Sequence, residues 1–348
     1  FGLFTGESWG FIGSRAFVKD IQGFECITQP SPDYCSFPYR TDTNFTFVDI
    51  KNIDSFIQLD QIGTVTSDNA EAKQLYFHFD PEFSTPDQII TALKSAALPL
   101  DVVASKSSVS QIPPSSVMSF MKARKDIPAL VLSNYDKNYV NQYYHSSFDD
   151  LSNVDTQRVC DVSSILARTI FSLATDSDQK ATLPEGFGAN CTFTTALLQC
   201  FAGSFDCPLF EEYYYAPDEE VPETTNYAGV YRKSHISINS KFLFDIMSNI
   251  TARHHYEACN KTSECLAAGT TCVAHRCITG PTVYYHDALS PGITYQDGRY
   301  VVVDSSEPLW TEASWHSTYI QLFEMSNPSK DVAILSLGVA ECLLCFVS

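Results

Sequence analysis

A glutamate flanked by small residues lies near the start of the chain and is the clearest candidate for chemistry. The segment reads Thr5-Gly6-Glu7-Ser8-Trp9-Gly10-Phe11-Ile12-Gly13-Ser14. Residues 1–7 predict a strand, and the glycines that follow predict a turn into a helix. The carboxyl ends of strands face the ligand crevice in sheet-based enzymes, so Glu7 could act as a general base. Taken alone, a helix-capping role for Glu7 is the simpler interpretation.

Two further segments hold residues that could bind a metal. Asp60 ends a predicted strand in Gln58-Leu59-Asp60-Gln61-Ile62-Gly63. His145 lies in Tyr144-His145-Ser146-Ser147-Phe148-Asp149-Asp150. Carboxylate and imidazole groups are both zinc ligands. For His145 by itself, a structural histidine on the surface or in a hydrogen bond is the simpler interpretation.

Strand and helix signals alternate in the first half of the chain. Aromatic and branched residues predict strands at 55–60, 74–79 and 129–133. Between the last two, helices are expected after Ser84-Thr85-Pro86-Asp87 and after Pro113-Pro114-Ser115-Ser116. The second of these carries Val117, Phe120 and Met121 on one side. This alternation predicts an α/β fold, with helices on the faces of a parallel or mixed sheet.

A longer helix is expected from Thr156 to Ala174. Its apolar residues recur at helical spacing and predict a core-facing side: Val159, Val162, Leu166, Ile170 and Leu173. The composition changes near residue 180, and helices are then expected at 193–209 and 242–251. We therefore expect a first domain at 1–180, a helical, cysteine-rich segment at 181–328 and a juxtamembrane segment at 329–348.

Composition excludes some classes of protein. The 348 residues carry 41 acidic and 22 basic side chains, which gives a formal net charge of −19. Such a surface repels a phosphate backbone, so we expect no nucleic-acid partner. Hydrophobic residues make up 44% and charged residues 18%, which is typical of a globular chain long enough for two domains.

The 12 cysteines indicate an oxidising compartment. Four lie close together in a loop-like stretch: Cys259, Cys265, Cys272 and Cys277. They are separated by five, six and four residues, whereas zinc sites favour pairs with two to four intervening residues. We expect disulfides here, with zinc as the alternative. Short loop closure favours pairing Cys26 with Cys35 and Cys200 with Cys207, and the remaining connectivity is open.

Four Asn-x-Ser/Thr sequons point to the same compartment: Asn44, Asn190, Asn249 and Asn260. Asn327 precedes a proline, which disqualifies its sequon. Together with the cysteines, the sequons predict a lumenal or extracellular glycoprotein. Such a chain needs a targeting segment. Because none is visible, we expect the natural N-terminus to lie upstream of Phe1.

The last 17 residues, 332–348, are apolar apart from Glu341 and a few small polar residues. A membrane span needs about 20 apolar residues, and we expect this run to be the start of one. Glu341 opposes that expectation, because an ionised side chain in lipid costs at least ~2.5 kcal/mol. A buried C-terminal helix is the alternative.

The three candidate segments resemble motifs of the co-catalytic zinc aminopeptidase family. The first resembles Glu-Glu-x-Gly-Leu-x-Gly-Ser, in which the leading Glu is the general base and the second Glu a zinc ligand. Glu7 matches the base, but Ser8 stands in the ligand position. The segments around Asp60 and His145 resemble Asn-Leu-Asp-Met-Ile-Gly and His-Thr-x-x-Asp-Thr, whose Asp and His bind zinc.

The resemblance implies an eroded metal site. A two-zinc centre needs a bridging carboxylate and terminal ligands, and a neutral serine hydroxyl is a poor substitute for carboxylate. Asp60 and His145 would then be vestigial ligands, with no catalytic residue and no cofactor. A single-zinc enzyme that uses Glu7, Asp60 and His145 is the alternative.

Other segments resemble the nicastrin family, which is related to those peptidases. The first motif has that family's form, Gly-Glu-x-x-x-(Tyr/Phe)-Ile-Gly-Ser, with Phe11 where tyrosine is usual. The stretch from Pro113 to Asn134 and the segment Leu309-Trp310-Thr311-Glu312-Ala313-Ser314-Trp315 also match. The resemblance covers both ends and the middle of the chain, and it is weakest between about 190 and 280.

This resemblance implies a fold and a role. The fold would be the C-terminal part of a zinc-aminopeptidase-like mixed sheet, followed by a helical, disulfide-containing segment and a single type I membrane anchor. The role would be that of a non-catalytic γ-secretase subunit with presenilin and two small multi-pass subunits as partners. Its location would be the endoplasmic reticulum, Golgi, endosomes and plasma membrane.

The same resemblance implies how substrates would be recognised. A pocket around Glu7, Ser8 and Phe11 would meet the short N-termini of type I membrane-protein substrates, and the ectodomain would exclude longer ones. An active extracellular zinc exopeptidase and a transferrin-receptor-like binding receptor are the alternatives.

Overall fold

The computed structural model divides the chain into two compact units, Phe1–Ser314 and Trp315–Ser348. The residues that it describes are 1–4, 6–22, 26–28, 37–38, 49–64, 73–144, 146, 148–175, 182–213, 238–267, 270–280, 292–297, 299–307, 309, 332–333 and 335–339.

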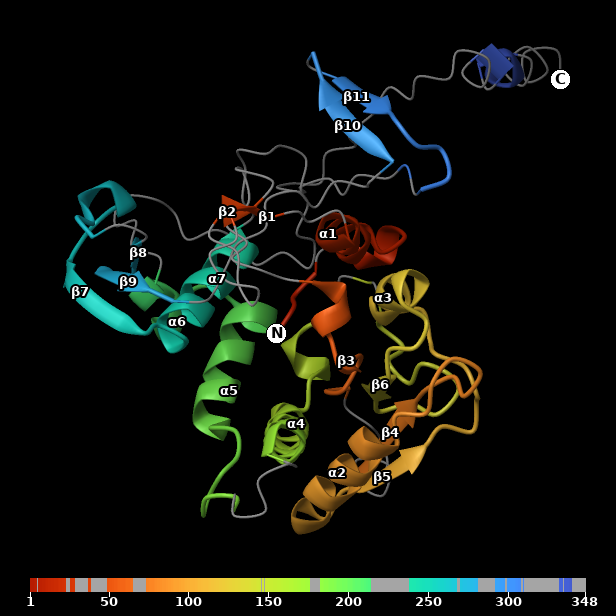
Figure 1. Cartoon of the computed structure of the whole chain (residues 1–348), viewed down its shortest axis with the longest axis vertical. Helices are drawn as coiled ribbons and strands as arrows, with labels where there is room; N and C mark the ends of the chain where they lie inside the picture. Colours follow the sequence, from red (N-terminus) through yellow and green to blue (C-terminus); the bar gives the residue numbers. More distant parts are fainter. Residues whose placement is uncertain are drawn as a thin grey trace, which may run out of the picture. The chain divides into compact units, whose positions relative to one another are not determined.

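A four-stranded mixed sheet is the centre of the first unit (Figure 1). Its strands, in spatial order, are β3 (Phe56–Leu59), β6 (Ala129–Ser133), β4 (Gln74–His78) and β5 (Val103–Lys106). β3 runs parallel to β6, β4 runs antiparallel to β6, and β5 runs parallel to β4. The three strands expected from the sequence are confirmed, and β5 is an addition to them.

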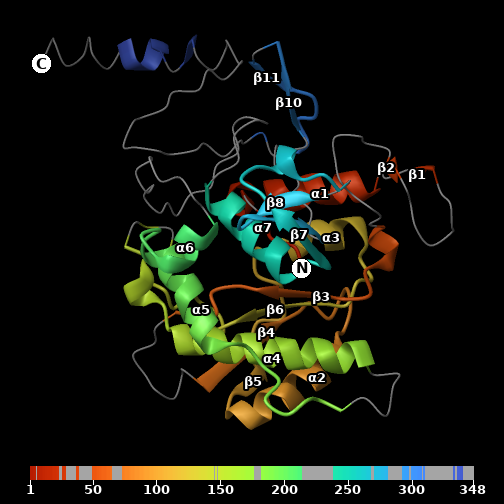
Figure 2. The same cartoon turned by 90° about the vertical axis from the view of Figure 1, so that its left-hand side faces the viewer.

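Helices cover both faces of this sheet (Figure 2). On one face lie α2 (Asp87–Ala97) and α4 (Thr156–Thr175), and on the other lie α1 (Ile12–Gln22) and α3 (Val117–Ala123). All five residues of β6 are buried, because Leu130 and Leu132 face the first pair of helices whereas Ala129 and Val131 face the second. The predicted α/β architecture is therefore confirmed.

The predicted buried side of the long helix α4 is partly wrong. Val162 is fully buried as expected, but Ile170 is exposed. The buried positions are instead Arg158, Cys160, Val162, Ser164, Ile165 and Thr169. α4 packs against both α2 and α5 (Cys191–Leu198), so a single apolar stripe does not describe its contacts.

The predicted strand at residues 1–7 is also wrong. Glu7 begins a single 3-10 turn, η1 (Glu7–Trp9), and none of the strands in the described part of the chain pairs with residues 1–4. A strand needs a neighbour to satisfy its backbone groups. The side chain of Phe4 packs instead against Phe17 and Phe120.

A second, aromatic core follows the first domain. It is built by α5, the π-helical turn η6 (Gln199–Gly203), α6 (Pro208–Tyr213) and α7 (Ile238–Ile250). Three of its phenylalanines are at most 2% exposed: Phe205, Phe210 and Phe242. The helices expected near 193–209 and 242–251 are thus present, although the first of them is broken into three pieces.

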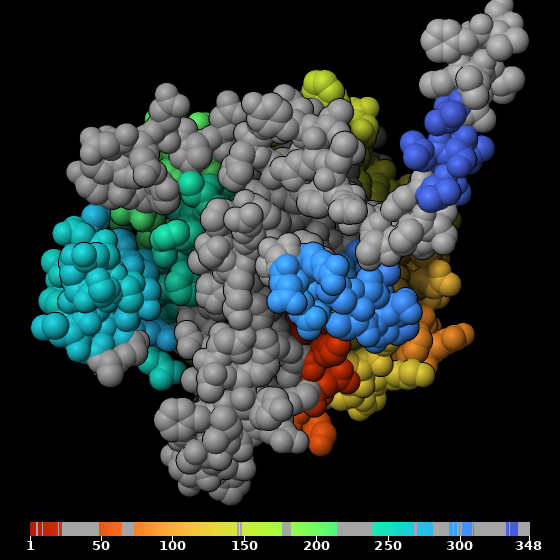
Figure 3. Space-filling view, turned by 90° about the horizontal axis from the view of Figure 1, so that it is seen from above, coloured from red at the N-terminus to blue at the C-terminus, as the bar shows by residue number. Residues whose placement is uncertain are grey.

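A small sheet with the order β7-β9-β8 comes next, and Figure 3 shows part of it as an exposed group at the surface. Its strands are β7 (His254–Ala258), β8 (Thr271–Val273) and β9 (Arg276–Thr279). Two further hairpins are β1–β2 (Cys26–Thr28 and Phe37–Pro38) and β10–β11 (Ile293–Gln296 and Arg299–Val302). Other 3-10 turns among the described residues are η2 (Ile50–Asn52), η4 (Leu98–Leu100), η5 (Leu151–Asn153) and η7 (Thr262–Glu264).

Four disulfides join cysteines of the described residues: Cys160–Cys191, Cys200–Cys207, Cys259–Cys272 and Cys265–Cys277. Short loop closure correctly indicated Cys200–Cys207. The pair Cys160–Cys191 was not expected, because its partners lie 31 residues apart. The expected pair Cys26–Cys35 involves a residue outside the described part of the chain.

The second unit contains a few described residues, 332–333 and 335–339, which are helical. Among the residues that the structure describes, no helix is both long and apolar enough to cross a bilayer. The expected start of a transmembrane helix is therefore unconfirmed.

Candidate functional site

Glu7 caps the helix that follows it. Its Oε1 accepts a 2.9 Å hydrogen bond from the backbone N–H of Ser14, in the first turn of α1. The backbone adopts the left-handed conformation at Gly6, Gly10 and Phe11, with φ of 71°, 92° and 61°. This conformation suits glycine but is strained at Phe11. The turn brings the glutamate back onto the helix, so the capping role expected for Glu7 is present.

The second carboxylate oxygen of Glu7 is in a different position. Oε2 is buried, and none of the described residues donates a hydrogen bond to it. A buried carboxylate oxygen without a donor is costly, and such atoms often mark a ligand or water position. Ser8, the next residue, is exposed. Of the two oxygens of Glu7, Oε1 therefore accepts the helix-capping hydrogen bond, whereas Oε2 has no donor among the described residues.

A buried serine pair joins this turn to the neighbouring helix. Ser14 Oγ lies 2.7 Å from Ser119 Oγ of α3, and both residues are buried. Together with the Ser14–Glu7 hydrogen bond, this contact links Glu7 to both helices on one face of the sheet. The position of the carboxylate is therefore set by helix packing, and not by the loop alone.

Asp60 lies at the carboxyl end of β3 and is held by a tyrosine from the adjacent strand end. Its backbone N–H donates to the carbonyl of Leu132 at 2.9 Å. Its Oδ2 accepts a 2.8 Å hydrogen bond from the hydroxyl of Tyr135, which follows β6. Because β3 and β6 are parallel, both residues lie at the edge where α/β proteins place ligands.

Three tyrosines form a ladder beside Asp60. The ring centroids of Tyr135 and Tyr139 are 4.9 Å apart, as are those of Tyr139 and Tyr144, in edge-to-face arrangements. Burial, together with the negative charge of Asp60, raises the pKa of Tyr135 and of Tyr139. The pKa of Tyr144 is raised to about 12, mainly by burial and further by the nearby Tyr139 and Asp60. All three phenols therefore stay protonated at neutral pH.

A buried histidine contacts the backbone carbonyl of Tyr135. His78 of β4 places Nε2 2.8 Å from Ser133 Oγ and 3.1 Å from the carbonyl oxygen of Tyr135. Burial lowers the pKa of His78, and the Tyr135 hydrogen bond and Asp136 oppose it only in part. His78 and Ser133 are at most 3% exposed, so this pair positions Tyr135 and is not open to a substrate.

Two amide side chains near Asp60 lack some of their hydrogen-bond partners. Gln61 has a left-handed backbone, with φ of 48°, and neither amide atom has a partner among the described residues. Asn134 is 6% exposed, and its Nδ2 donates to the carbonyl of Thr64 at 3.3 Å while its Oδ1 has no partner there. Strain and unmet polar groups gather at functional sites.

The contact found for Asp60 is with a residue that the sequence analysis did not single out, and the position of another expected ligand is undetermined. Asp60 meets Tyr135, whereas His145 lies outside the described residues. Sequence reasoning missed Tyr135, His78 and Asn134. Tyr135 and Asn134 directly follow a predicted strand that lies parallel to β3, so strand-end position is the signal that could have found them.

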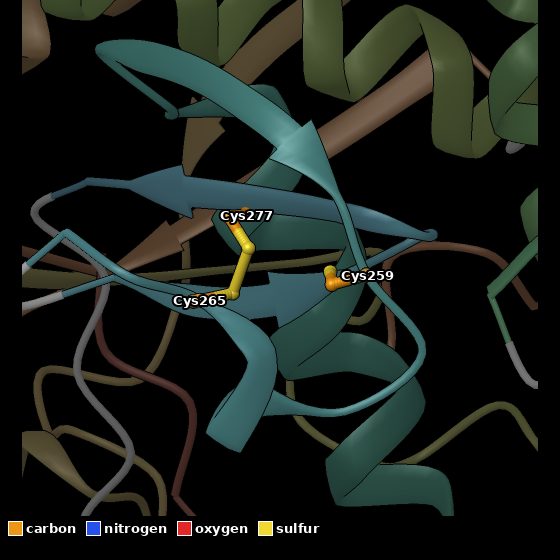
Figure 4. Close-up of side chains that lie close together, drawn as sticks. All are labelled: Cys259, Cys265 and Cys277. Atoms are coloured by element: carbon orange, nitrogen blue, oxygen red, sulfur yellow. A yellow bond between two sulfur atoms is a disulfide. The ribbon is translucent and has the colours of Figure 1, made fainter.

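The one cluster of three potential metal ligands within 4.8 Å, in the part of the chain that the structure describes, is Cys259, Cys265 and Cys277. Figure 4 shows the disulfide between Cys265 and Cys277, with Cys259 close by. Cys259 is itself bonded to Cys272. Zinc is bound by thiolates, so the structure favours the disulfide expectation for this stretch over zinc.

The Glu7-Ser8 pair offers one carboxylate, and not two, to a metal. One oxygen of Glu7 caps α1. The exposed hydroxyl of Ser8 offers no charge to a metal. No step of a metal-dependent reaction is therefore assigned to these residues.

Comparison with known proteins gives a consistent family. The family model for the nicastrin large lobe matches residues 1–177. Nicastrin of Dictyostelium purpureum is 29% identical over 356 residues, covering 99% of this chain and 53% of that protein. Nicastrins of Arabidopsis thaliana and Homo sapiens are 26% and 24% identical, covering 100% and 99% of this chain. The chain spans about half the length of these curated relatives.

A solved structure agrees with that assignment. The crystal structure of the gamma-secretase component nicastrin aligns with a TM-score of 0.69 and 27% identity, covering 90% of this chain and 54% of that one. An aminopeptidase from Aneurinibacillus sp. strain AM-1 aligns at a TM-score of 0.32 and 19% identity, covering 49% of this chain and 32% of that one. On the match to its first 177 residues, the chain belongs to the nicastrin family.

Proposed function

We propose that this chain is part of a non-catalytic, peptidase-shaped subunit of γ-secretase. The observation that carries the proposal is the family match over residues 1–177, together with the 0.69 TM-score to a solved γ-secretase component. The subunit contributes to assembly and stability of the protease complex. Presenilin supplies the catalytic residues, and two small multi-pass subunits complete the complex.

Two features of the Glu7 motif support a non-catalytic role. Ser8 stands where the related peptidases carry a zinc-binding glutamate. Glu7 itself gives one oxygen to the helix cap, which is a structural role that needs no reaction. Asp60 and His145 are vestigial positions of the lost metal site.

We propose that the pocket around Glu7, Ser8 and Phe11 receives the free N-terminus of a substrate. The Oε2 of Glu7 supports this, because none of the described residues donates to it and a carboxylate oxygen can accept a hydrogen bond from an ammonium group. Type I membrane proteins with short ectodomains would reach the pocket, and the bulk of the ectodomain would exclude longer ones.

The proposed setting is a single-pass type I membrane protein with its ectodomain in the lumen or outside the cell. Four disulfides among the described residues support an oxidising compartment. The proposed segments are 1–180, 181–328 and 329–348. Separate cores support the first boundary, because the sheet packs against α1–α4 whereas Phe205, Phe210 and Phe242 form their own cluster.

An active zinc exopeptidase is the second candidate, and one observation favours it. Asp60, a ligand type in the related peptidases, is retained at the carboxyl end of β3 and is oriented by Tyr135. Metal ligands commonly have such hydrogen-bonded supports. The missing carboxylate at Ser8 makes this candidate weaker than the first.

Co-purification tests the leading proposal. The protein that carries this chain is tagged, extracted from membranes in mild detergent and captured, and presenilin is measured in the eluate. Recovery of presenilin in constant proportion to the tagged protein is the expected result. Capture of the tagged protein without presenilin, from membranes that contain both, would contradict a γ-secretase role.

A further inference from the structure

The sequons among the described residues differ in what their asparagine side chains do. Asn190, Asn249 and Asn260 all fit Asn-x-Ser/Thr. An N-linked glycan is attached to the side-chain nitrogen Nδ2, and acceptor sites lie in surface loops. An asparagine whose Nδ2 is already used in packing is therefore a poor carrier in the folded protein.

The Nδ2 of Asn249 is already used in packing. The residue lies in the last turn of α7, and its Nδ2 donates a 2.8 Å hydrogen bond to the hydroxyl of Tyr213, the last residue of α6. The Tyr213 ring lies edge-to-face against Phe242 in the aromatic core, with centroids 6.2 Å apart. This asparagine therefore ties α7 to α6.

The hydroxyl of the same sequon is also engaged. Thr251 Oγ1 donates to the carbonyl of Met247 at 2.6 Å, which holds the end of α7 in helical form. Burial raises the pKa of Tyr213, although the Asn249 hydrogen bond opposes the shift. The tyrosine therefore remains a neutral hydroxyl and an acceptor for Nδ2. A sugar replaces one of the two Nδ2 hydrogens and would have to fit against the half-buried Tyr213 at the end of α7.

The other two sequons present their asparagines differently. Asn190 is exposed and caps α5, and it uses Oδ1, which accepts from the backbone N–H of Phe193 at 3.2 Å. Asn260 is exposed, and its backbone N–H donates to Glu264 Oε2 at 2.8 Å. Neither contact uses Nδ2, so both residues can carry a glycan without loss of the hydrogen bond.

We infer that Asn190 and Asn260 carry N-linked glycans and that Asn249 does not. The inference rests on the proposed lumenal location. Each glycan adjoins a disulfide cysteine, since Asn190 precedes Cys191 and Asn260 follows Cys259. Partner subunits must then bind surfaces away from these two positions, whereas the α6–α7 face at Asn249 is free of sugar.

Site mapping on the unmodified protein tests the inference. The protein is purified from a eukaryotic host, treated with peptide N-glycosidase in ¹⁸O water and digested. Isotope-labelled aspartate is expected at positions 190 and 260, with unlabelled asparagine at position 249. Label at position 249 would overturn the inference. Absence of label at every sequon would also overturn it, but through failure of the proposed lumenal location.

Variants give a second, independent readout. Asn44 lies outside the described residues, so all variants are built in an Asn44→Gln background. Asn190→Gln and Asn260→Gln are each expected to remove one glycan step on a gel, and Asn249→Gln none. A lost step in Asn249→Gln would overturn the inference. If that variant fails to fold, the site mapping still decides.

The structural role of Asn249 has its own control. Tyr213→Phe and Asn249→Leu each remove one partner of the same hydrogen bond. Each is expected to lower Tm, and the double variant is expected to lower it by less than the sum, because partners in contact are not additive. If the two decreases in Tm are fully additive, the Asn249–Tyr213 hydrogen bond does not stabilise the contact between α6 and α7.

Discussion

The backbone N–H of Ser14 donates a 2.9 Å hydrogen bond to Oε1 of Glu7, so the residue that resembles a catalytic base is a helix cap. Ser14 Oγ lies 2.7 Å from Ser119 Oγ, which carries the link on to α3. The other oxygen of Glu7 has no donor among the described residues. The two oxygens therefore separate a structural role from a proposed recognition role, and mutation can test each.

The capping role predicts a loss of stability. Glu7→Ala removes the acceptor for the Ser14 N–H and should lower the free energy of unfolding by about 1 kcal/mol, as loss of a cap does. Glu7→Gln keeps an oxygen at this position and should cost less. Urea denaturation measures both. Glu185→Ala is the control, because Glu185 is exposed in the loop before α5. A Glu7→Ala protein as stable as that control would contradict the cap.

The Tyr135–Asp60 hydrogen bond predicts a larger effect. Tyr135→Phe keeps the ring but removes the hydroxyl that donates to Asp60 at 2.8 Å. A hydrogen bond to a charged group is worth about 1.5–3 kcal/mol, so the free energy of unfolding should fall by that order. Tyr143→Phe, at an exposed tyrosine of the same loop, should change little. Equal effects of the two substitutions would argue that Tyr135 does not hold Asp60.

Glu307 predicts a pH-dependent contribution to stability. Its carboxylate lies 2.9 Å from Arg15 Nη1 of α1 and 3.2 Å from Lys122 Nζ of α3. Burial acts to raise the pKa of Glu307, but Arg15 and Lys122 outweigh it, so the pKa lies below its ordinary value. A lowered folded-state pKa means that the stabilisation is present above the unfolded pKa and is lost as pH falls through the folded one.

Glu307→Gln should therefore destabilise the protein by up to about 1 kcal/mol at neutral pH. The difference from wild type should shrink as pH falls below the ordinary glutamate range of about 4.3. Urea denaturation at several pH values measures it, with Glu185→Gln as the control. A difference that grows on acidification would have the wrong sign for this ion pair.

The disulfides predict a graded series. Cys160–Cys191 closes a sequence separation of 31 residues and Cys200–Cys207 one of 7. In the chain-entropy model these loops correspond to roughly 3.7 and 2.4 kcal/mol. Paired Cys→Ser substitutions should therefore destabilise the protein more at Cys160 and Cys191 than at Cys200 and Cys207. Denaturation of both variants gives the comparison, and the reverse order would contradict the loop-length argument.

Most of the first domain could be predicted from sequence because its signals are local. Helix α3 follows its two prolines and buries Val117, Phe120 and Met121 as expected. The strand at 129–133 reads as an apolar run, and all five residues are buried. In these elements, periodicity, capping and burial agree.

The rest depends on long-range contacts that one sequence does not reveal. The pairing of Cys160 with Cys191 and the contact of His78 with the Tyr135 carbonyl can be identified only once the fold is known. Residues 1–4 read as a strand but pair with none of the described strands. For the site, Glu7 and Asp60 were identified from segments that resemble family motifs, whereas Tyr135 required knowledge that β3 and β6 are neighbours.

Metal analysis with an activity assay tests most directly the proposal that this member of the nicastrin family is not a zinc enzyme. The purified protein is dialysed, its zinc is measured by mass spectrometry, and release of amino acids from unblocked peptides is followed in wild type and Glu7→Gln. The account predicts no stoichiometric zinc and no hydrolysis above that of Glu7→Gln. Stoichiometric zinc, with hydrolysis that disappears in Glu7→Gln, would contradict it.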